Sequence, residues 1–499
     1  MHHVLVKLNT VCWLVIAAAS SAGLATAADL RLLEAAKQSD VQLANRLLKE
    51  HVGVNARYGD GSTAIAWAAY NNNAAMADLL IRAGADVNAA NDDGAAPLHL
   101  ACNNRSAPMV ERLLAAGANA NAKLLSGETV LMTCARTGEA AAVKALLDHK
   151  ADPNLKESAH GQTALMWAAA QSHSEAVHLL IAAGADIRAR SLSYPTTVVG
   201  EQTQRSGREK LNYTEIRGGM TPLMFAARDG DAESAKLLLA AGADANDLLP
   251  NGMSVLVLAA HSGKGDVAEL LLAKGADPNA NGVGYTALHA ATLRNDLSLT
   301  KALLAKRADP NARMTKGTAI RRSTTDFNLP STLIGATPYL LAAKFAEPDI
   351  MQALVTGGAD AKATLPNGAT ALMLAAGLGS ARNRRVVPLI ESPSLIFQAV
   401  ANAVELGADV NAANPAGDTA LHLVATAGND NAVQLLADHG ANVNLKNKRG
   451  ETPLMLASTA GGRRAAAAAD ADNDITGVPT VVKGHASTVA LLRKLGATQ

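Results

Sequence analysis

The sequence predicts an all-α repeat solenoid, made of stacked helix-turn-helix units with β-hairpin fingers between them. Three observations favour this fold class. The 499 residues exceed what a single hydrophobic core usually supports. Aromatic residues make up only 3% of the chain, whereas alanine recurs in pairs, which suits helices that pack closely. A glycine that is usually followed two residues later by threonine recurs with a base period of about 33 residues.

Residues 1–27 have the three parts of a secretory signal peptide. Lys7 supplies a positive start, residues 11–19 form a short apolar run, and Ala25-Thr26-Ala27 has the small-x-small pattern of a cleavage site. We therefore expect cleavage after Ala27 and export to the periplasm or the exterior. An uncleaved membrane anchor is the alternative, although the apolar run is shorter than the roughly 20 residues that a span needs.

The remaining residues, 28–499, are expected to form a cap and about eleven repeats. Residues 29–57 contain two helical segments without the opening glycine, as expected for an N-terminal cap. The opening glycines of the repeats are Gly61, Gly94, Gly127, Gly161, Gly219, Gly252, Gly284, Gly335, Gly368, Gly417 and Gly450. Four stretches interrupt the period and are interpreted as insertions: 191–218, 314–334, 379–395 and 461–484.

Each repeat carries signals for two helices and a turn. In the repeat that opens at Gly219, Thr221 is placed to cap the first helix and Pro222 to occupy its first position. Gly242 follows a leucine-rich segment and is expected to end the second helix in a left-handed conformation. An Asp-x-Asn turn ending at Asn246 then leads the chain into a two-stranded finger.

A 33-residue period with Thr-Pro-Leu-His-x-Ala is the signature of ankyrin repeats. The segments Ala-Pro-Leu-His-Leu-Ala at 96–101 and Thr-Pro-Leu-Met-Phe-Ala at 221–226 resemble it, and the resemblance extends from about Asp29 to the end of the chain. It implies a non-enzymatic module that binds a protein through a concave face lined by first helices and fingers. The partner-facing positions that it implies are Tyr70, Asn103, Arg136, Gln171, Arg228, Asp229, His261, Tyr285, Lys344 and Phe345.

The sequence motifs indicate no catalytic residues, no cofactor and no metal site. His99, His289 and His422 occupy one place in the repeat, and other repeats carry methionine there, so a structural role is expected. Lys and Arg total 45 against 44 Asp and Glu, which argues against a nucleic-acid partner. We expect a monomer that binds one or more exported or envelope proteins.

The exported chain would keep two cysteines, Cys102 and Cys134, in adjacent first helices. Helix axes lie about 10 Å apart, and a disulfide needs Cα atoms within about 7 Å. The sequence therefore predicts two buried thiols.

Two alternatives stay open. One is an enzyme whose site is built in the insertions 191–218 and 314–334, which contain the carboxylates Glu201, Glu209, Glu215 and Asp326. The other is a purely structural scaffold of the cell envelope, which the sequence does not separate from specific binding.

Overall fold

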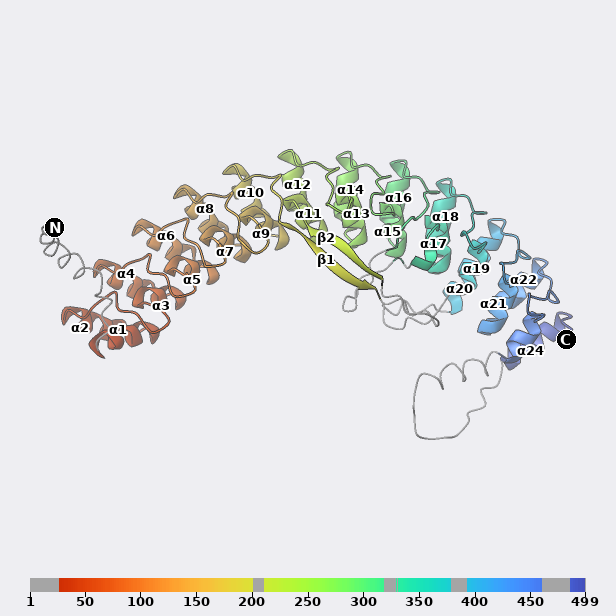
Figure 1. Cartoon of the computed structure of the whole chain (residues 1–499), viewed down its shortest axis with the longest axis horizontal. Helices are drawn as coiled ribbons and strands as arrows, with labels where there is room; N and C mark the ends of the chain where they lie inside the picture. The colour runs from red at the N-terminus through yellow and green to blue at the C-terminus, as the bar shows by residue number, and fades with distance from the viewer. Residues whose placement is uncertain are drawn as a thin grey trace, which may run out of the picture. The chain divides into compact units, whose positions relative to one another are not determined.

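The computed structural model describes residues 27–200, 211–317, 329, 331–377, 393–459 and 485–498. The chain divides into two compact units, Met1–Leu192 and Ser193–Gln499. Both units consist of successive pairs of short helices, as the repeat period predicts (Figure 1). Most of the predicted signal peptide lies outside the described residues, and the first described helix begins at Ala27.

In unit 1 the first and second helices of the pairs alternate along the chain. The first helices are α1 (Ala27–Lys37), α3 (Ala64–Tyr70), α5 (Pro97–Asn103), α7 (Val130–Thr137) and α9 (Ala164–Ala170). The second helices are α2 (Val41–Lys49), α4 (Ala74–Arg82), α6 (Ala107–Ala115), α8 (Ala140–Asp148) and α10 (Ser174–Ala182). Consecutive first helices pack side by side, α1 on α3, α3 on α5, α5 on α7 and α7 on α9.

Unit 2 opens with a two-stranded sheet and continues with the same alternation. Its strands are β1 (Ser193–Gly200) and β2 (Leu211–Gly218). Its first helices are α11 (Pro222–Asp229), α13 (Val255–His261), α15 (Ala287–Leu293), α17 (Pro338–Lys344), α19 (Ala371–Ala375) and α21 (Ala420–Ala427). Its second helices are α12 (Ala232–Ala240), α14 (Gly265–Ala273), α16 (Leu297–Ala305), α18 (Pro348–Thr356), α20 (Pro393–Glu405), α22 (Asp430–Asp438) and α24 (Ala486–Lys494). Residues 453–459 are also helical, and Ser331–Leu333 form a 3-10 turn, η2.

The helices begin and end where the sequence signals predict. Thr370 accepts the backbone N–H of Met373 at 3.2 Å, which caps α19. Gly84 ends the second helix α4 with a φ of 86°. Thr221 is an exception, because it precedes α11 with extended backbone but its side chain makes no capping hydrogen bond. Alanine pairs such as Ala68-Ala69 are fully buried and let neighbouring first helices approach closely.

Four of the predicted fingers in the described residues are tight turns, each held by a single bridge. Arg57 pairs with Thr63 and Leu248 with Ser254 in this way. At Gly61, which has a φ of 79°, an added Cβ would meet the Asn91 backbone of the next turn at 3.1 Å, so the stacking of turns requires glycine there. Within the described residues, only the finger enlarged by the 191–218 insertion forms true strands.

An asparagine ladder joins consecutive turns. Asn121, for example, donates from Nδ2 to the Lys150 carbonyl (3.1 Å) and accepts the Asp152 N–H at Oδ1 (2.8 Å). The same pair of bonds recurs at Asn55, Asn88, Asn154, Asn246, Asn279, Asn311, Asn411 and Asn444. Lys362 occupies the corresponding place in its own turn. Its backbone N–H donates to Asp360 Oδ1, as the backbone N–H of a ladder asparagine donates to the residue two positions before it. Lysine has no acceptor, so it cannot reproduce both bonds of the ladder.

The insertions differ in how they meet the repeats. Residues 193–200 and 211–218 pair in antiparallel register, Ser193 opposite Gly218. In the view of Figure 1 this hairpin extends from the row of first helices of unit 2. Leu329 and Leu333 of the 314–334 insertion are buried. The predicted range 379–395 was too long at its end, since α20 begins at Pro393; the rest of it, and 461–484, lie outside the described residues.

Candidate functional site

The candidate site in unit 1 is a row of side chains at the C-terminal ends of the first helices, which we call the first-helix stripe. It comprises Lys37, Gln38, Tyr70, Asn71, Asn103, Asn104, Arg136, Thr137, Ala170 and Gln171. Lys37, Tyr70, Asn103 and Arg136 are exposed and follow one another at intervals of one repeat. Because α1, α3, α5 and α7 pack in this order, the sequence period becomes a row in space.

Hydrogen bonds between repeats fix the backbone of the first-helix stripe. A helix end leaves carbonyl groups without intrahelical partners, and here a side chain of the next repeat donates to one of them. Four of these bonds run from Asn71 Nδ2 to the Lys37 carbonyl (2.8 Å), from Asn104 Nδ2 to the Tyr70 carbonyl, from Thr137 Oγ1 to the Cys102 carbonyl (3.1 Å) and from His173 Nε2 to the Arg136 carbonyl (3.0 Å). The ends of successive first helices are therefore tied to one another.

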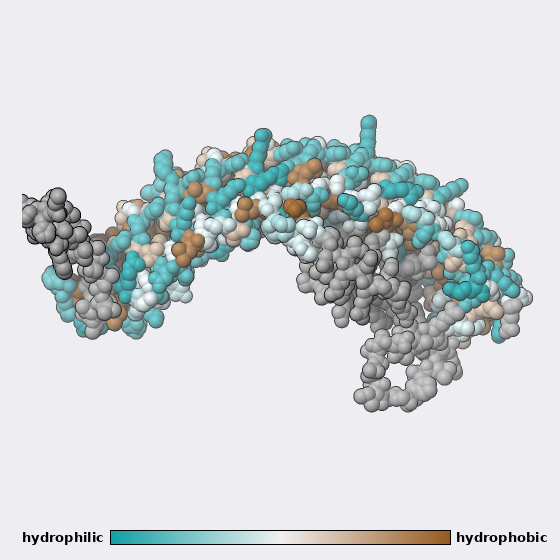
Figure 2. Space-filling view, in the orientation of Figure 1, coloured by the Kyte–Doolittle hydropathy of each residue, from teal (hydrophilic) through white to brown (hydrophobic). Residues whose placement is uncertain are grey.

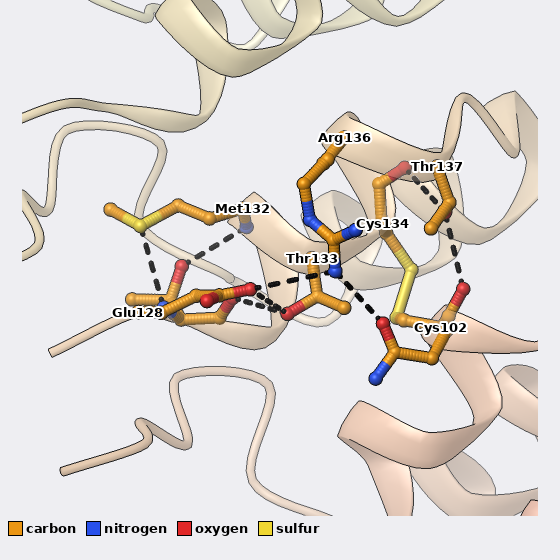
Figure 3. Close-up of a disulfide and its surroundings, with 9 residues drawn as sticks. Cys102, Glu128, Met132, Thr133, Cys134, Arg136 and Thr137 are labelled. Carbon is orange, nitrogen blue, oxygen red and sulfur yellow. Dashed lines mark hydrogen bonds and ion pairs between the residues drawn. A yellow bond between two sulfur atoms is a disulfide. The ribbon is translucent and has the colours of Figure 1, made fainter. Parts of the chain in front are cut away.

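A disulfide lies directly beneath the first-helix stripe. Cys102 of α5 and Cys134 of α7 are fully buried and bonded to each other, with Cα atoms 4.8 Å apart (Figure 3). The expectation of two free thiols was wrong because it used the distance between helix axes. Cα atoms lie about 2.3 Å from the axis, so facing residues of helices 10 Å apart approach to about 5.4 Å.

Arg136 is held in place from three sides. Its Nη2 donates to Asn103 Oδ1 at 2.9 Å and lies 4.0 Å from Glu128 Oε1, as Figure 3 shows for the labelled Glu128. Its guanidinium carbon lies 5.7 Å from the centre of the Trp167 ring. These contacts span three consecutive repeats, and 42% of the side chain remains exposed. Arg136 is thus a positioned cation at the surface of the first-helix stripe.

A second cation and two aromatic rings lie at the start of the first-helix stripe. Lys37 Nζ lies 5.2 Å from the centre of the Trp67 ring, and Tyr70 meets that ring edge-on at 5.6 Å. Tyr70 is 57% exposed. The sequence interpretation missed Lys37 because it treated residues 29–57 only as a polar cap; its place one full repeat before Tyr70 was the signal that would have found it.

The predicted partner-facing residues of unit 2 have different surroundings. Arg228 is exposed but forms a bidentate pair with Asp229, at 2.9 and 2.7 Å, and covers the Phe225 ring. Lys344 and Phe345 are half-buried at the end of α17. These four side chains stay candidates. Arg228 is 42% exposed, the same fraction as Arg136, and its pairing with Asp229 is what distinguishes it from the residues of the first-helix stripe.

Tyr285 is not partner-facing, so that prediction was wrong. The side chain is only 4% exposed and packs against the half-buried ring of His261, with centroids 5.8 Å apart. An aromatic ring at the residue after the opening glycine reaches the end of the preceding first helix and is covered there. A smaller or charged residue stands at this place in other repeats, for example Ser62 and Glu128.

The histidines of the capping turns have the structural role predicted from the sequence. His289 accepts the Thr286 N–H at Nδ1 (3.2 Å) and donates from Nε2 to the Ala336 carbonyl of the next repeat (3.2 Å). Burial lowers the pKa of His289 to about 4, and the same cause lowers the pKa of His99 to about 4. Both imidazoles are therefore neutral at pH 7, and His289 links its capping turn to the next repeat.

Across the described residues no cluster of His, Cys, Asp and Glu is arranged to hold a metal ion. In the same part of the chain no helix is long and apolar enough to span a membrane. Of the carboxylates named for the enzyme alternative, Glu215 lies in β2, and Glu201, Glu209 and Asp326 lie outside the described residues. On the face shown in Figure 2, hydrophobic residues lie singly among hydrophilic ones.

Paired helices and stacked turns define a helical-repeat protein. A family model of three consecutive ankyrin repeats matches residues 32–124, 106–191, 223–314 and 394–469, more than half of the chain. The chain belongs to the ankyrin-repeat family. Ankyrin repeats generally mediate protein–protein interactions and typically have no catalytic activity. A comparison with curated proteins found no match.

Proposed function

We propose that this protein is a non-enzymatic binding module that acts outside the cytoplasm and holds a partner protein through its first-helix ends and turns. One observation carries the proposal. The first-helix stripe presents exposed side chains from successive repeats on backbone that is tied together by four inter-repeat hydrogen bonds. Preorganised side chains lose little entropy on binding, which favours affinity.

Two observations support the location. Residues 1–27 have the pattern of a signal peptide, with Lys7 and Ala25-Thr26-Ala27. The Cys102–Cys134 disulfide is of the kind that persists in oxidising compartments and is rare in the cytosol. We expect mass spectrometry of protein recovered outside the cytoplasm to show a start at Ala28. An intact Met1 on the exported protein would contradict this expectation.

Capture of a partner tests the binding function. The chain from Ala28 onward is immobilised and exposed to the envelope and secreted fractions of the source cells, alongside a folded Tyr70→Ala/Asn103→Ala variant. We expect the parent to retain a protein that the variant loses, because both side chains are exposed in the first-helix stripe. Equal capture by parent and variant would place the binding surface elsewhere.

A further inference from the structure

The first-helix stripe differs in charge from the unit that carries it. Residues 28–192 contain 15 Lys and Arg against 17 Asp and Glu, so unit 1 is slightly acidic as a whole. The ten residues of the first-helix stripe include two cations, Lys37 and Arg136, and no carboxylate. A local excess of positive charge on an acidic background is the pattern that complements an anionic partner.

Two carboxylates beside the first-helix stripe are already engaged. Glu34, one turn before Lys37, accepts hydrogen bonds from Gln38 (2.6 Å) and Tyr58 (3.0 Å). Glu128 accepts the Thr133 hydroxyl at 2.8 Å, and its Oε1 stays 4.0 Å from Arg136 Nη2. An Arg guanidinium has five N–H donors, and the bond to Asn103 uses one of them. Arg136 therefore keeps the capacity to bind a carboxylate of a partner.

The polar neutral residues of the first-helix stripe indicate an extended partner segment. Gln38, Asn103 and Gln171 are exposed amides. Gln38 Nε2 already donates to Glu34 and Asn103 Oδ1 already accepts from Arg136, and an amide has two donor hydrogens and two acceptor lone pairs, so each keeps further capacity. The backbone of a helix satisfies its own hydrogen bonds, whereas an extended chain offers N–H and C=O groups along its whole length. Tyr70, exposed between the two cations, provides an apolar contact of the kind that anchors interfaces.

The spacing sets the length of the segment. Lys37 and Arg136 are three repeats apart, which at helix spacings of about 10 Å corresponds to about 30 Å. At about 3.3 Å per residue, an extended chain covers that distance with about nine residues. We propose, on the basis of the proposed function above, that the first-helix stripe of unit 1 binds an extended acidic segment of a partner protein. Carboxylates near its two ends meet Lys37 and Arg136, and an apolar side chain between them covers Tyr70.

A synthetic peptide tests this directly against the whole exported chain. The probe is a fluorescein-labelled peptide of about twelve residues, with glutamates at both ends and leucine in the middle, titrated by fluorescence anisotropy. The control peptide has the same sequence with glutamine in place of every glutamate. We expect the acidic peptide to bind about tenfold or more tightly than the glutamine peptide, the scale of a charge-assisted hydrogen bond, and to weaken as salt rises. Equal affinity of the two peptides, or no binding of either, would overturn the proposal.

Variants of the chain separate the first-helix stripe from general surface charge. Lys37→Gln/Arg136→Gln should lower affinity for the acidic peptide about tenfold. The matched control is Lys144→Gln in the second helix α8, where Lys144 is exposed and paired with Asp148 at 2.7 Å; this change should leave affinity unchanged. An equal loss in the control would assign binding to net charge. Binding of heparin with the same dependence on the two cations would make the stripe a general polyanion site and overturn the assignment to a protein segment.

Failure of this inference is distinguishable from failure of the proposed function. If Tyr70→Ala/Asn103→Ala abolishes capture of a partner protein but Lys37→Gln/Arg136→Gln does not, the stripe binds a partner and the acidic-segment inference is wrong. If neither variant changes capture, both the proposed function and the acidic-segment inference are wrong. Circular dichroism of each variant confirms that it remains helical.

Discussion

Glu347 is a buried carboxyl group that should make stability fall as pH rises. It precedes α18, its side chain is 6% exposed, and neither carboxylate oxygen has a hydrogen-bond partner among the described residues. Burial raises the pKa of Glu347 to about 9, against an ordinary value of 4.5. The folded chain therefore keeps this proton over a pH range in which the unfolded chain releases it.

The magnitude follows from linkage between protonation and folding. Below pH 4.5 the group is neutral in both states and costs nothing through ionisation. Above pH 4.5, ionisation stabilises the unfolded state relative to the folded state by about 1.4 kcal/mol per pH unit, until the carboxyl group of the folded state also ionises near pH 9. At pH 7 the accumulated loss is about 3 kcal/mol, as an upper value. Glu347→Gln keeps the shape but removes the titration, so it should stabilise the protein at pH 7 by up to this amount.

Urea unfolding between pH 4.5 and 8.5, followed by circular dichroism, measures the effect, and hydrogen exchange in α18 localises it. The curves of the parent and of Glu347→Gln should converge at pH 4.5 and separate as pH rises. The matched control is Glu139→Gln at the corresponding N-cap of α8, where the side chain is partly exposed. It should lack the stabilisation that Glu347→Gln gives at pH 7, because its side chain is not buried. Parallel profiles for the parent and Glu347→Gln would refute the argument.

Three further predictions concern the links between and within repeats. Replacing Cys102 and Cys134 with alanine should destabilise their repeats by about 3 to 4 kcal/mol, the entropy of a closed loop of 32 residues, measured by urea unfolding; an unchanged midpoint would show that the disulfide adds nothing. Lys362→Asn should restore a step of the asparagine ladder and slow hydrogen exchange in α20, with a gain of about 1 kcal/mol; unaltered exchange would count against the ladder. Thr370→Ala should cost about 1 kcal/mol and Thr221→Ala clearly less, since only Thr370 makes the capping bond; equal losses would contradict that distinction.

Local patterns in the sequence were enough to predict the repeated helix pairs. A capping threonine, a helix-ending glycine and buried alanines act over a few residues, so the sequence of each repeat specifies its own secondary structure. The same holds for His289 and His422, whose bonds to Thr286 and Thr419 lie within one turn. The repeat period also placed Tyr70, Asn103 and Arg136 in one row, because equivalent residues of packed repeats must lie side by side.

Contacts between repeats were decided by the tertiary structure alone. The closeness of Cys102 to Cys134, the burial of Tyr285 and the place of Lys37 over Trp67 depend on how far neighbouring helices approach and on which side chain fills the space between them. A period gives the order of the repeats but not their separation to within a few ångströms. Whether a buried carboxyl group such as that of Glu347 has a hydrogen-bond partner depends on the distances between neighbouring repeats. Those distances are set by the packing of side chains from different repeats.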